Sequence, residues 1–319
     1  MTEITIQKND AGQRVDRFLS KTYPNLKTAL VCKLLRKKRI KLNGARSEPN
    51  VILKEGDVLR FYLSDELLAK EPRKIEKSDI SAEINVVYED ENILLIDKPA
   101  GLVVHEDNDN SQDTLIDRVL SYLYQKGEYD PELENSFVPA LVNRIDRNTS
   151  GIVIAAKNAE ALRILNQKVR DREIQKLYLC AVLGRLRPVA ATLTAYLKKL
   201  SEENRVIVSD KKQDGFLTIR TKYRVMKSSG ELSLVEVDLL TGRTHQIRAH
   251  FAHIGHPLLG DEKYGDSAVN KRYRVKKQAL CSYRLIFKFT TDAGILEYLN
   301  GKDFSIKEAD DLWFVERFN

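Results

Sequence analysis

The sequence predicts an α+β protein in which a small basic α+β module precedes a larger domain built on a mixed β-sheet. Strand-like and helix-like segments do not alternate regularly, which argues against a doubly wound parallel sheet. At 319 residues the chain exceeds a typical single domain, so we expect two. Residues 1–77 hold 18 Lys and Arg against 10 Asp and Glu, a net charge of +8, whereas the whole chain carries +7. The excess positive charge therefore belongs to the first quarter of the chain, where a polyanion is the expected partner.

The first domain is expected to span residues 1–65. Apolar residues at helical spacing predict helices over Arg14–Ser20 and Thr28–Lys38, and Asn43-Gly44 is a turn signal between short strands. No acidic residue interrupts the basic residues at the end of the second helix, which are Lys33, Arg36, Lys37, Lys38 and Arg39. A solvated helix surface would explain these charges. The lack of compensating acids favours binding to nucleic acid, which would weaken steeply with salt.

Residues 66–83 are rich in Glu, Lys and Asp and predict a flexible or partly helical linker, so the second domain is expected at residues 84–319. In that domain, alternating apolar residues bounded by turn signals predict strands, and longer periodic segments predict helices. The strands are expected at Asn85–Tyr88, Ile93–Ile96, Lys176–Val182, Thr218–Val225, Ser233–Leu240 and Leu285–Phe289, and the helices at Leu115–Tyr124 and Ala159–Val169.

The stretch Leu141–Gly151 in the second domain contains a polar turn that is a candidate catalytic site. Apolar residues precede and follow it, and Asp146 lies within it between Arg144 and Arg147. Nearby positive charge keeps a carboxylate ionised, and an ionised Asp can act as a nucleophile. An Asp that caps a turn and pairs with arginines is the simpler interpretation of this stretch taken alone.

A second stretch, Thr241–Pro257, contains four of the five histidines. We expect no metal site there, because the stretch has no Cys, Asp or Glu and matches no zinc signature that carries a general base. Thr241-Gly242-Arg243-Thr244 lacks the frame of a phosphate-binding loop. A helix that begins near Thr244, with Arg243 and Arg248 close by, would instead present cations to a carboxylate or phosphate.

The remaining composition indicates a cytoplasmic protein. Cys32, Cys180 and Cys281 stand far apart without a CxxC pair, which suits reduced thiols. No apolar run approaches the length of a membrane span, and the first residues do not form a signal-peptide pattern. We expect neither a cofactor nor contact with a membrane.

Taken together, the motifs resemble the RluA-type pseudouridine synthases from about residue 84 to the end. Residues 12–63 resemble the S4-like (alpha-L) RNA-binding domain. Three blocks in order carry the main resemblance: Glu89-Asp90 through Lys98-Pro99-Ala100-Gly101 to His105, Arg144-Ile145-Asp146-Arg147-Asn148-Thr149-Ser150-Gly151, and Thr241–Arg248 through Gly255–Asp261 to Tyr264-Gly265. The resemblance implies a mixed, largely antiparallel catalytic sheet of the pseudouridine synthase type and isomerisation of uridine in RNA without cofactor or metal.

The resemblance also implies roles for particular residues. Asp146 matches the catalytic nucleophile, although the atom that it attacks, on the sugar or on the base, stays open. Tyr178 matches the tyrosine that stacks on uracil and is a candidate to remove the C5 proton. Arg248 matches the arginine that pairs with the aspartate, and Arg144 the side chain that fills the space left by a flipped-out base.

Two positions depart from the family pattern: Asn143 stands where His is usual, and Leu280-Cys281-Ser282 where Leu-His-Ala is usual. Both bear on substrate contacts rather than on the nucleophile. Large-subunit ribosomal RNA is the favoured substrate, transfer RNA stays open, and a monomer is expected. The alternatives are an RNA-binding protein without catalysis and a metal-dependent hydrolase built on the histidines.

Overall fold

The computed structural model describes residues 1–70, 81–106, 113–200, 202–307, 309 and 312–318. The chain divides into two compact units. The first comprises Met1–Glu83, Asp117–Ala140 and Ala156–Arg163, and the second comprises Ile84–Ile116, Leu141–Ala155 and Ile164–Asn319. Residues 71–80 of the expected linker lie outside the described residues, and the domain boundaries at 65 and 84 stay predictions. None of the helices in the described part of the chain is long and apolar enough to cross a membrane.

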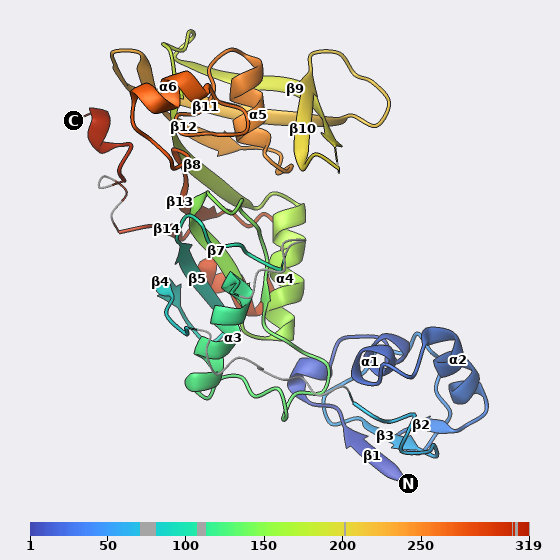
Figure 1. Ribbon diagram of the computed structural model, residues 1–319. Helices are drawn as coiled ribbons and strands as arrows, with labels where there is room; N and C mark the ends of the chain where they lie inside the picture. Colours follow the sequence, from blue (N-terminus) through green and yellow to red (C-terminus); the bar gives the residue numbers. More distant parts are fainter. Residues whose placement is uncertain (71–80, 107–112, 201, 308, 310–311, 319) are drawn as a thin grey trace. The chain divides into compact units, whose positions relative to one another are not determined.

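The amino-terminal module, within the first unit, is a three-stranded antiparallel sheet with two helices. The strands lie in the order β1 (Thr2–Thr5), β3 (Val58–Phe61), β2 (Ile40–Leu42), and the helices are α1 (Val15–Thr22) and α2 (Thr28–Arg36) (Figure 1). Both expected helices are present and end within two residues of the predicted bounds. A short 3₁₀ helix, η1, covers Lys8–Asp10. Fully buried side chains from both helices and from β2 and β3 form its core, including Phe18, Leu19, Leu35, Ile40 and Phe61.

The second unit is organised around one large sheet. Its strands lie in the order β10-β9-β11-β12-β8-β13-β7-β5-β4, with β14 against β13 and β6 against β7. All its pairings between neighbours of known register are antiparallel except β13 with β7, which is parallel. The predicted class, α+β with a mixed and largely antiparallel sheet, is confirmed. The strands are β4 (Asn85–Glu89), β5 (Ile93–Lys98), β6 (Ala140–Leu141), β7 (Ser150–Ala156), β8 (Ile174–Leu183), β9 (Ala190–Leu200), β10 (Arg205–Ser209), β11 (Leu217–Ser229), β12 (Leu232–Leu239), β13 (Leu280–Phe287) and β14 (Asp303–Ser305).

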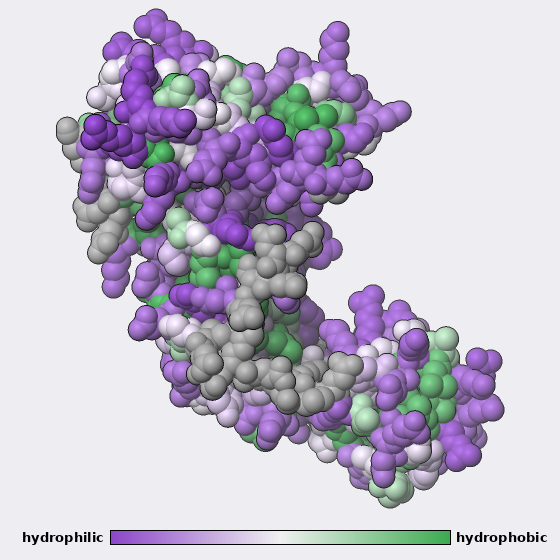
Figure 2. Space-filling model, viewed as in Figure 1, coloured by the Kyte–Doolittle hydropathy of each residue, from purple (hydrophilic) through white to green (hydrophobic). Residues whose placement is uncertain are grey.

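The remaining helices are short or amphipathic. The α-helices are α3 (Leu115–Gln125), α4 (Ala159–Arg170), α5 (Gln246–His253) and α6 (Ser267–Arg272), and the 3₁₀ helices are η2 (Gly294–Leu299) and η3 (Glu316–Phe318). Helices α3 and α4 lie where the sequence predicts them. Figure 2 shows that hydrophilic side chains cover much of the viewed surface around α5, α6, β9 and β10.

The parallel pairing of β7 with β13 depends on a glycine. Gly151 has φ of 109°, and a Cβ built there would lie 2.2 Å from the carbonyl oxygen of Ser282. Only a residue without a side chain permits this approach, because no rotamer moves a Cβ away from backbone. The glycine therefore fixes the position of β7 against β13, and with it the position of the polar turn that precedes β7.

Helix α5 packs against the β9–β10–β11 side of the sheet. Ala249 joins a buried cluster with Ala195, Leu197, Val206 and Ile219. The small side chain of Ala249 lets the helix lie close to the strands. This packing fixes the positions of Arg248 and of His245, which immediately precedes the helix.

Candidate active site

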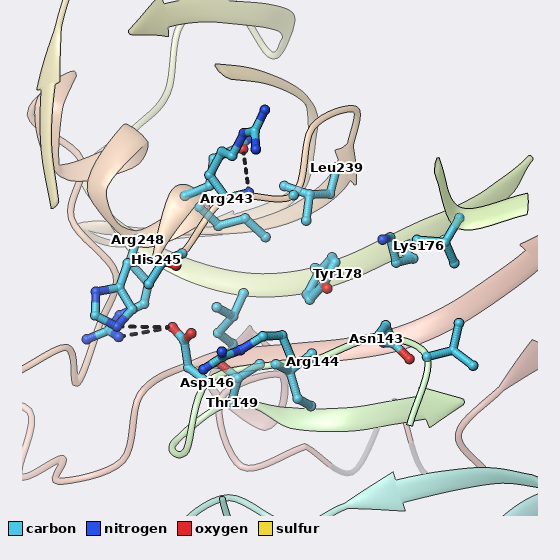
Figure 3. Close-up of a pocket in the computed structure, with 18 residues that line it drawn as sticks. Asn143, Arg144, Asp146, Thr149, Lys176, Tyr178, Leu239, Arg243, His245 and Arg248 are labelled. Atoms are coloured by element: carbon cyan, nitrogen blue, oxygen red, sulfur yellow. Dashed lines mark hydrogen bonds and ion pairs between the residues drawn. The ribbon is translucent and has the colours of Figure 1, made fainter. Parts of the chain in front are cut away.

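A cavity of about 280 Å³ in the second unit gathers the polar turn, strand β8 and the start of helix α5. Figure 3 shows side chains of all three entering it. Asp146, Tyr178 and Arg248, which are far apart in the sequence, line this one cavity, and so do Arg144 and Asn143.

The turn holds Asp146 at the edge of the cavity. Its backbone carbonyl accepts a hydrogen bond of 3.1 Å from the Thr149 N–H, which closes the turn. The Asp146 side chain is 24% exposed, and its Oδ2 accepts a hydrogen bond of 3.1 Å from Nη1 of Arg248. A partly exposed carboxylate that is paired with a cation is held in place and can still contact a ligand.

Arg248 is itself held by a second carboxylate. Asp261 is fully buried and accepts hydrogen bonds from Nε of Arg248 at 2.7 Å and from Nη2 at 2.9 Å. Asp261 also accepts from the backbone N–H groups of Lys263 and Tyr264. Burial alone would raise the pKa of Asp261 and lower that of Arg248, but their pairing overrides burial and shifts each pKa the opposite way. The guanidinium therefore stays charged in a fixed orientation.

The alternation of β8 directs two side chains into the cavity. Tyr178 and Lys176 are two residues apart and so lie on the same face of the strand (Figure 3). Tyr178 is 5% exposed, and burial raises its pKa to about 12. Burial lowers the pKa of Lys176. The phenol of Tyr178 is therefore uncharged at neutral pH.

A buried lysine supports the turn from behind. Lys98, at the end of β5, donates hydrogen bonds to the carbonyl oxygens of Pro99 at 2.9 Å, Leu102 at 2.7 Å and Arg147 at 3.0 Å. The Gly101 N–H donates to the same Arg147 carbonyl at 2.8 Å. Burial lowers the pKa of Lys98 to about 8, partly offset by the charge of Asp146. The Lys98–Gly101 block thus fixes the residue next to Asp146, a role that its sequence pattern did not predict.

His245 is the second neighbour of Asp146 that the sequence analysis did not assign. Its Nε2 lies 3.8 Å from Oδ2 of Asp146, and its Nδ1 lies 2.9 Å from the hydroxyl of Tyr264. Burial lowers the pKa of His245 to about 4. The histidine cluster suggested only metal ligands, which left His245 without a role, although the position of His245 three residues before Arg248 was a usable signal.

The other histidines of this stretch take separate partners. The ring of His250 contacts the hydroxyl of Thr221, His253 contacts Asp210, and Nδ1 of His256 lies 2.8 Å from the carbonyl oxygen of Leu183. Among the described residues no group of His, Cys, Asp and Glu converges as metal ligands would.

The two departures from the family pattern differ in their surroundings. Asn143 lines the cavity, and its Oδ1 accepts a hydrogen bond of 2.8 Å from the Ile154 N–H, so it ties the turn to β7. Cys281 is buried in β13 and does not line the cavity, whereas its neighbour Leu280 does. Arg144 is exposed at the cavity edge.

The basic helix end, comprising Lys33, Arg36, Lys37, Lys38 and Arg39, belongs to the first unit. All five of these residues are exposed on α2 and the turn that follows it. The left-handed conformation of Lys38, with φ of 58°, ends the helix and turns the chain toward β2.

Comparison with known proteins gives consistent results. Residues 92–253 match the family described as RNA pseudouridylate synthase. The chain is 33% identical over 267 residues to ribosomal large subunit pseudouridine synthase C of Vibrio cholerae, covering 82% of this chain and 80% of that one. It is 32% identical over 328 residues to an uncharacterised RNA pseudouridine synthase of Mycoplasma capricolum, and the match covers 99% of this chain and 100% of that one. The solved structure of human RNA Pseudouridylate Synthase Domain Containing 4 has the same fold, with a TM-score of 0.57 and 20% identity over 73% of this chain and 90% of that one.

Proposed function

The chain belongs to the RluA-type family of RNA pseudouridine synthases, which are isomerases, and we propose that it modifies uridines of large-subunit ribosomal RNA with Asp146 as the nucleophile. The observation that carries this proposal is the carboxylate of Asp146, partly open to the cavity and held on Arg248, which Asp261 holds in turn. Two buried or half-buried carboxylates thus share one guanidinium, and only that of Asp146 faces the space where a base could enter.

The reaction detaches uracil from the sugar and rejoins it through carbon. The bond between N1 and C1′ breaks, a bond between C5 and C1′ forms, and the C5 proton is replaced by one on N1. Asp146 attacks covalently, at the sugar or the base ring, and later leaves as a carboxylate. No electrons are gained or lost overall. Arg248 would pair with the carboxylate before attack and orient it for attack.

Tyr178 would position the uracil ring. A phenol with its pKa raised to about 12 keeps its proton at neutral pH and therefore donates hydrogen bonds rather than accepting a proton. This favours stacking over removal of the C5 proton as the role of Tyr178. Arg144, exposed at the cavity edge, is suited to fill the space that a flipped-out base leaves.

The basic helix end is proposed to bind RNA, as part of a domain of the S4-like type. Its five cations are exposed together on one helix end, and the Vibrio cholerae relative is named a ribosomal large subunit pseudouridine synthase. We propose that the protein acts in the cytoplasm as a monomer, with transfer RNA as the alternative substrate.

Release of tritium from RNA labelled at C5 of uridine tests the function directly. Wild type should release tritium from large-subunit ribosomal RNA, and Asp146→Asn should not, with a chelator making no difference. Release from transfer RNA alone would correct the substrate. No release from either RNA would leave RNA binding without catalysis as the function.

A further inference from the structure

The two neighbours of the Asp146 side chain approach the same oxygen. Nη1 of Arg248 lies 3.1 Å from Oδ2, and Nε2 of His245 lies 3.8 Å from Oδ2 (Figure 3). In the described part of the chain no hydrogen bond or ion pair reaches Oδ1 of Asp146. One oxygen is therefore anchored, and the other is available to a ligand in the cavity.

A short chain of hydrogen bonds determines which nitrogen of His245 carries the proton. The Tyr264 hydroxyl accepts a hydrogen bond of 2.8 Å from the Val206 N–H and lies 2.9 Å from Nδ1 of His245. Its own proton still requires an acceptor, and Nδ1 is the acceptor beside it. An imidazole that accepts at Nδ1 carries its proton on Nε2 when it is neutral, so the N–H points toward Asp146.

The surroundings of His245 keep its imidazole neutral. The charged or titratable groups facing the ring are Asp146, Arg248, Lys263, Asp261 and Tyr264, and burial outweighs the two carboxylates, so the pKa falls to about 4. His245 has φ of 52°. This left-handed conformation, in which His is one of the enriched residues, places the ring beside Arg248 just before helix α5.

We propose that His245 is a positioning residue which, together with Arg248, anchors Oδ2 of Asp146 and leaves Oδ1 to attack, and that Tyr264 sets the imidazole tautomer this requires. The proposal rests on the nucleophilic role of Asp146 proposed above. A neutral donor suits this task because it can hold Oδ2 both while Asp146 is a free carboxylate and after Asp146 has formed an ester. When Asp146 becomes an ester its charge is lost and its ion pair with Arg248 weakens, yet an ester carbonyl still accepts an N–H.

The separation of 3.8 Å is longer than a hydrogen bond. Contacts of this kind are often long in a free enzyme and shorten when substrate binds. We therefore expect the His245 contact to close when uridine enters the cavity.

The first test reads the tautomer itself. Ring-¹⁵N-labelled histidine, observed by long-range ¹H–¹⁵N NMR of the full chain, distinguishes a protonated Nδ1 from a protonated Nε2. We expect the His245 proton on Nε2 in wild type and a mixture of tautomers in Tyr264→Phe. A proton on Nδ1 in wild type would overturn the proposal. This readout does not depend on catalysis.

The second test is the single-turnover rate of pseudouridine formation at saturating RNA. Tyr264→Phe should lower this rate by roughly 10- to 100-fold, the size expected for a misplaced reacting group, with little change in RNA affinity. The matched control is Tyr223→Phe, which also removes a hydrogen-bonded tyrosine hydroxyl, one that donates to the Pro188 carbonyl at 2.8 Å. Equal rates for the two variants would overturn the proposal.

Substitutions of His245 itself distinguish the effect of its N–H donor from the effect of its size. His245→Gln retains an N–H donor and should be faster than His245→Leu, provided that thermal unfolding shows both folded. Equal rates in two folded variants would contradict a donor role. If Asp146→Asn proved as active as wild type, the proposed nucleophile would fail, and the NMR result would still decide the tautomer.

Discussion

Lys98 offers the sharpest test of how the turn is held, and we develop the prediction for Lys98→Met. Methionine has nearly the same length and shape but donates no hydrogen bond. The change removes three hydrogen bonds, to the carbonyl oxygens of Pro99, Leu102 and Arg147. The Arg147 carbonyl keeps the Gly101 N–H as a donor.

Two opposing effects decide the stability of this variant. A buried carbonyl that loses its donor costs about 1–3 kcal/mol, and less where water can reach it. For the two carbonyls of Pro99 and Leu102 together we expect a loss of about 2–4 kcal/mol. In wild type, burial lowers the pKa of Lys98 from 10.5 to about 8, which corresponds to a cost of about 3 kcal/mol for the charged form. Methionine avoids that cost. The net change in the free energy of unfolding should therefore stay within about 2 kcal/mol.

Activity should respond more strongly than stability. Without Lys98, the Arg147 carbonyl beside Asp146 keeps one hydrogen-bond donor, the Gly101 N–H, instead of two. A displacement of about 1 Å at a reacting group lowers a rate by about 10²-fold. Single-turnover pseudouridine formation and urea unfolding, measured on the same preparation, test both parts.

Lys168→Met is the matched control for Lys98→Met. Lys168 is also buried, but it pairs with Glu173 at 2.6 Å and does not line the cavity. Removing it leaves Glu173 buried without its cation, which should cost about 3–5 kcal/mol of stability while the folded fraction keeps its rate. The reasoning is refuted if Lys98→Met loses as much stability as Lys168→Met, or if it converts uridine at the wild-type rate.

Three further predictions concern the paired aspartate, a buried histidine and the basic helix end. Asp261→Asn should lower the single-turnover rate and destabilise the fold by about 3 kcal/mol, because Arg248 loses its buried partner; a normal urea midpoint would contradict this. Burial lowers the pKa of His250 to about 4, so the unfolded chain binds more protons between about pH 6.5 and 4, and the free energy of unfolding should fall as pH falls through that window, by up to about 1.4 kcal/mol per pH unit. His250→Gln should flatten that dependence in urea titrations at pH 5 and 7, and an unchanged slope would count against it. Replacing the basic helix end by glutamines should make the log–log salt slope of RNA binding shallower by roughly 0.7–0.9 for each phosphate that is no longer neutralised, whereas glutamines at Lys211 and Lys212 should leave the slope unchanged.

The sequence was sufficient for the fold class and for most of the helices. Helices α1, α2, α3 and α4 have apolar residues at regular helical spacing, and such local patterns can be detected without the rest of the fold. Strands β9 and β10 were not predicted. Several of their residues are exposed, and what makes them strands is the pairing of β9 with β11 and the packing of α5 against both strands, which are non-local contacts.

The site divides in the same way. Asp146, Tyr178 and Arg248 were found through motifs, and the structure brings all three to one cavity. The parts played by Lys98 and His245 could not be found in this way, because they depend on which backbone carbonyl or carboxylate oxygen lies opposite each side chain. That information appears only when β5, the polar turn and α5 are folded against one another.

The contact of Gly151 with Ser282 has a consequence for how the enzyme is made. Ser150 and Gly151 pair with Cys281 and Ser282, which the ribosome adds more than a hundred residues later. The polar turn thus lacks its neighbouring strand until β13 has been synthesised and inserted, and such long loop closures are slow. A nascent chain that has emerged only as far as α5 would contain Asp146, Tyr178 and Arg248 and yet have no assembled cavity. Catalysis would therefore begin only after β13 has been synthesised and paired with β7.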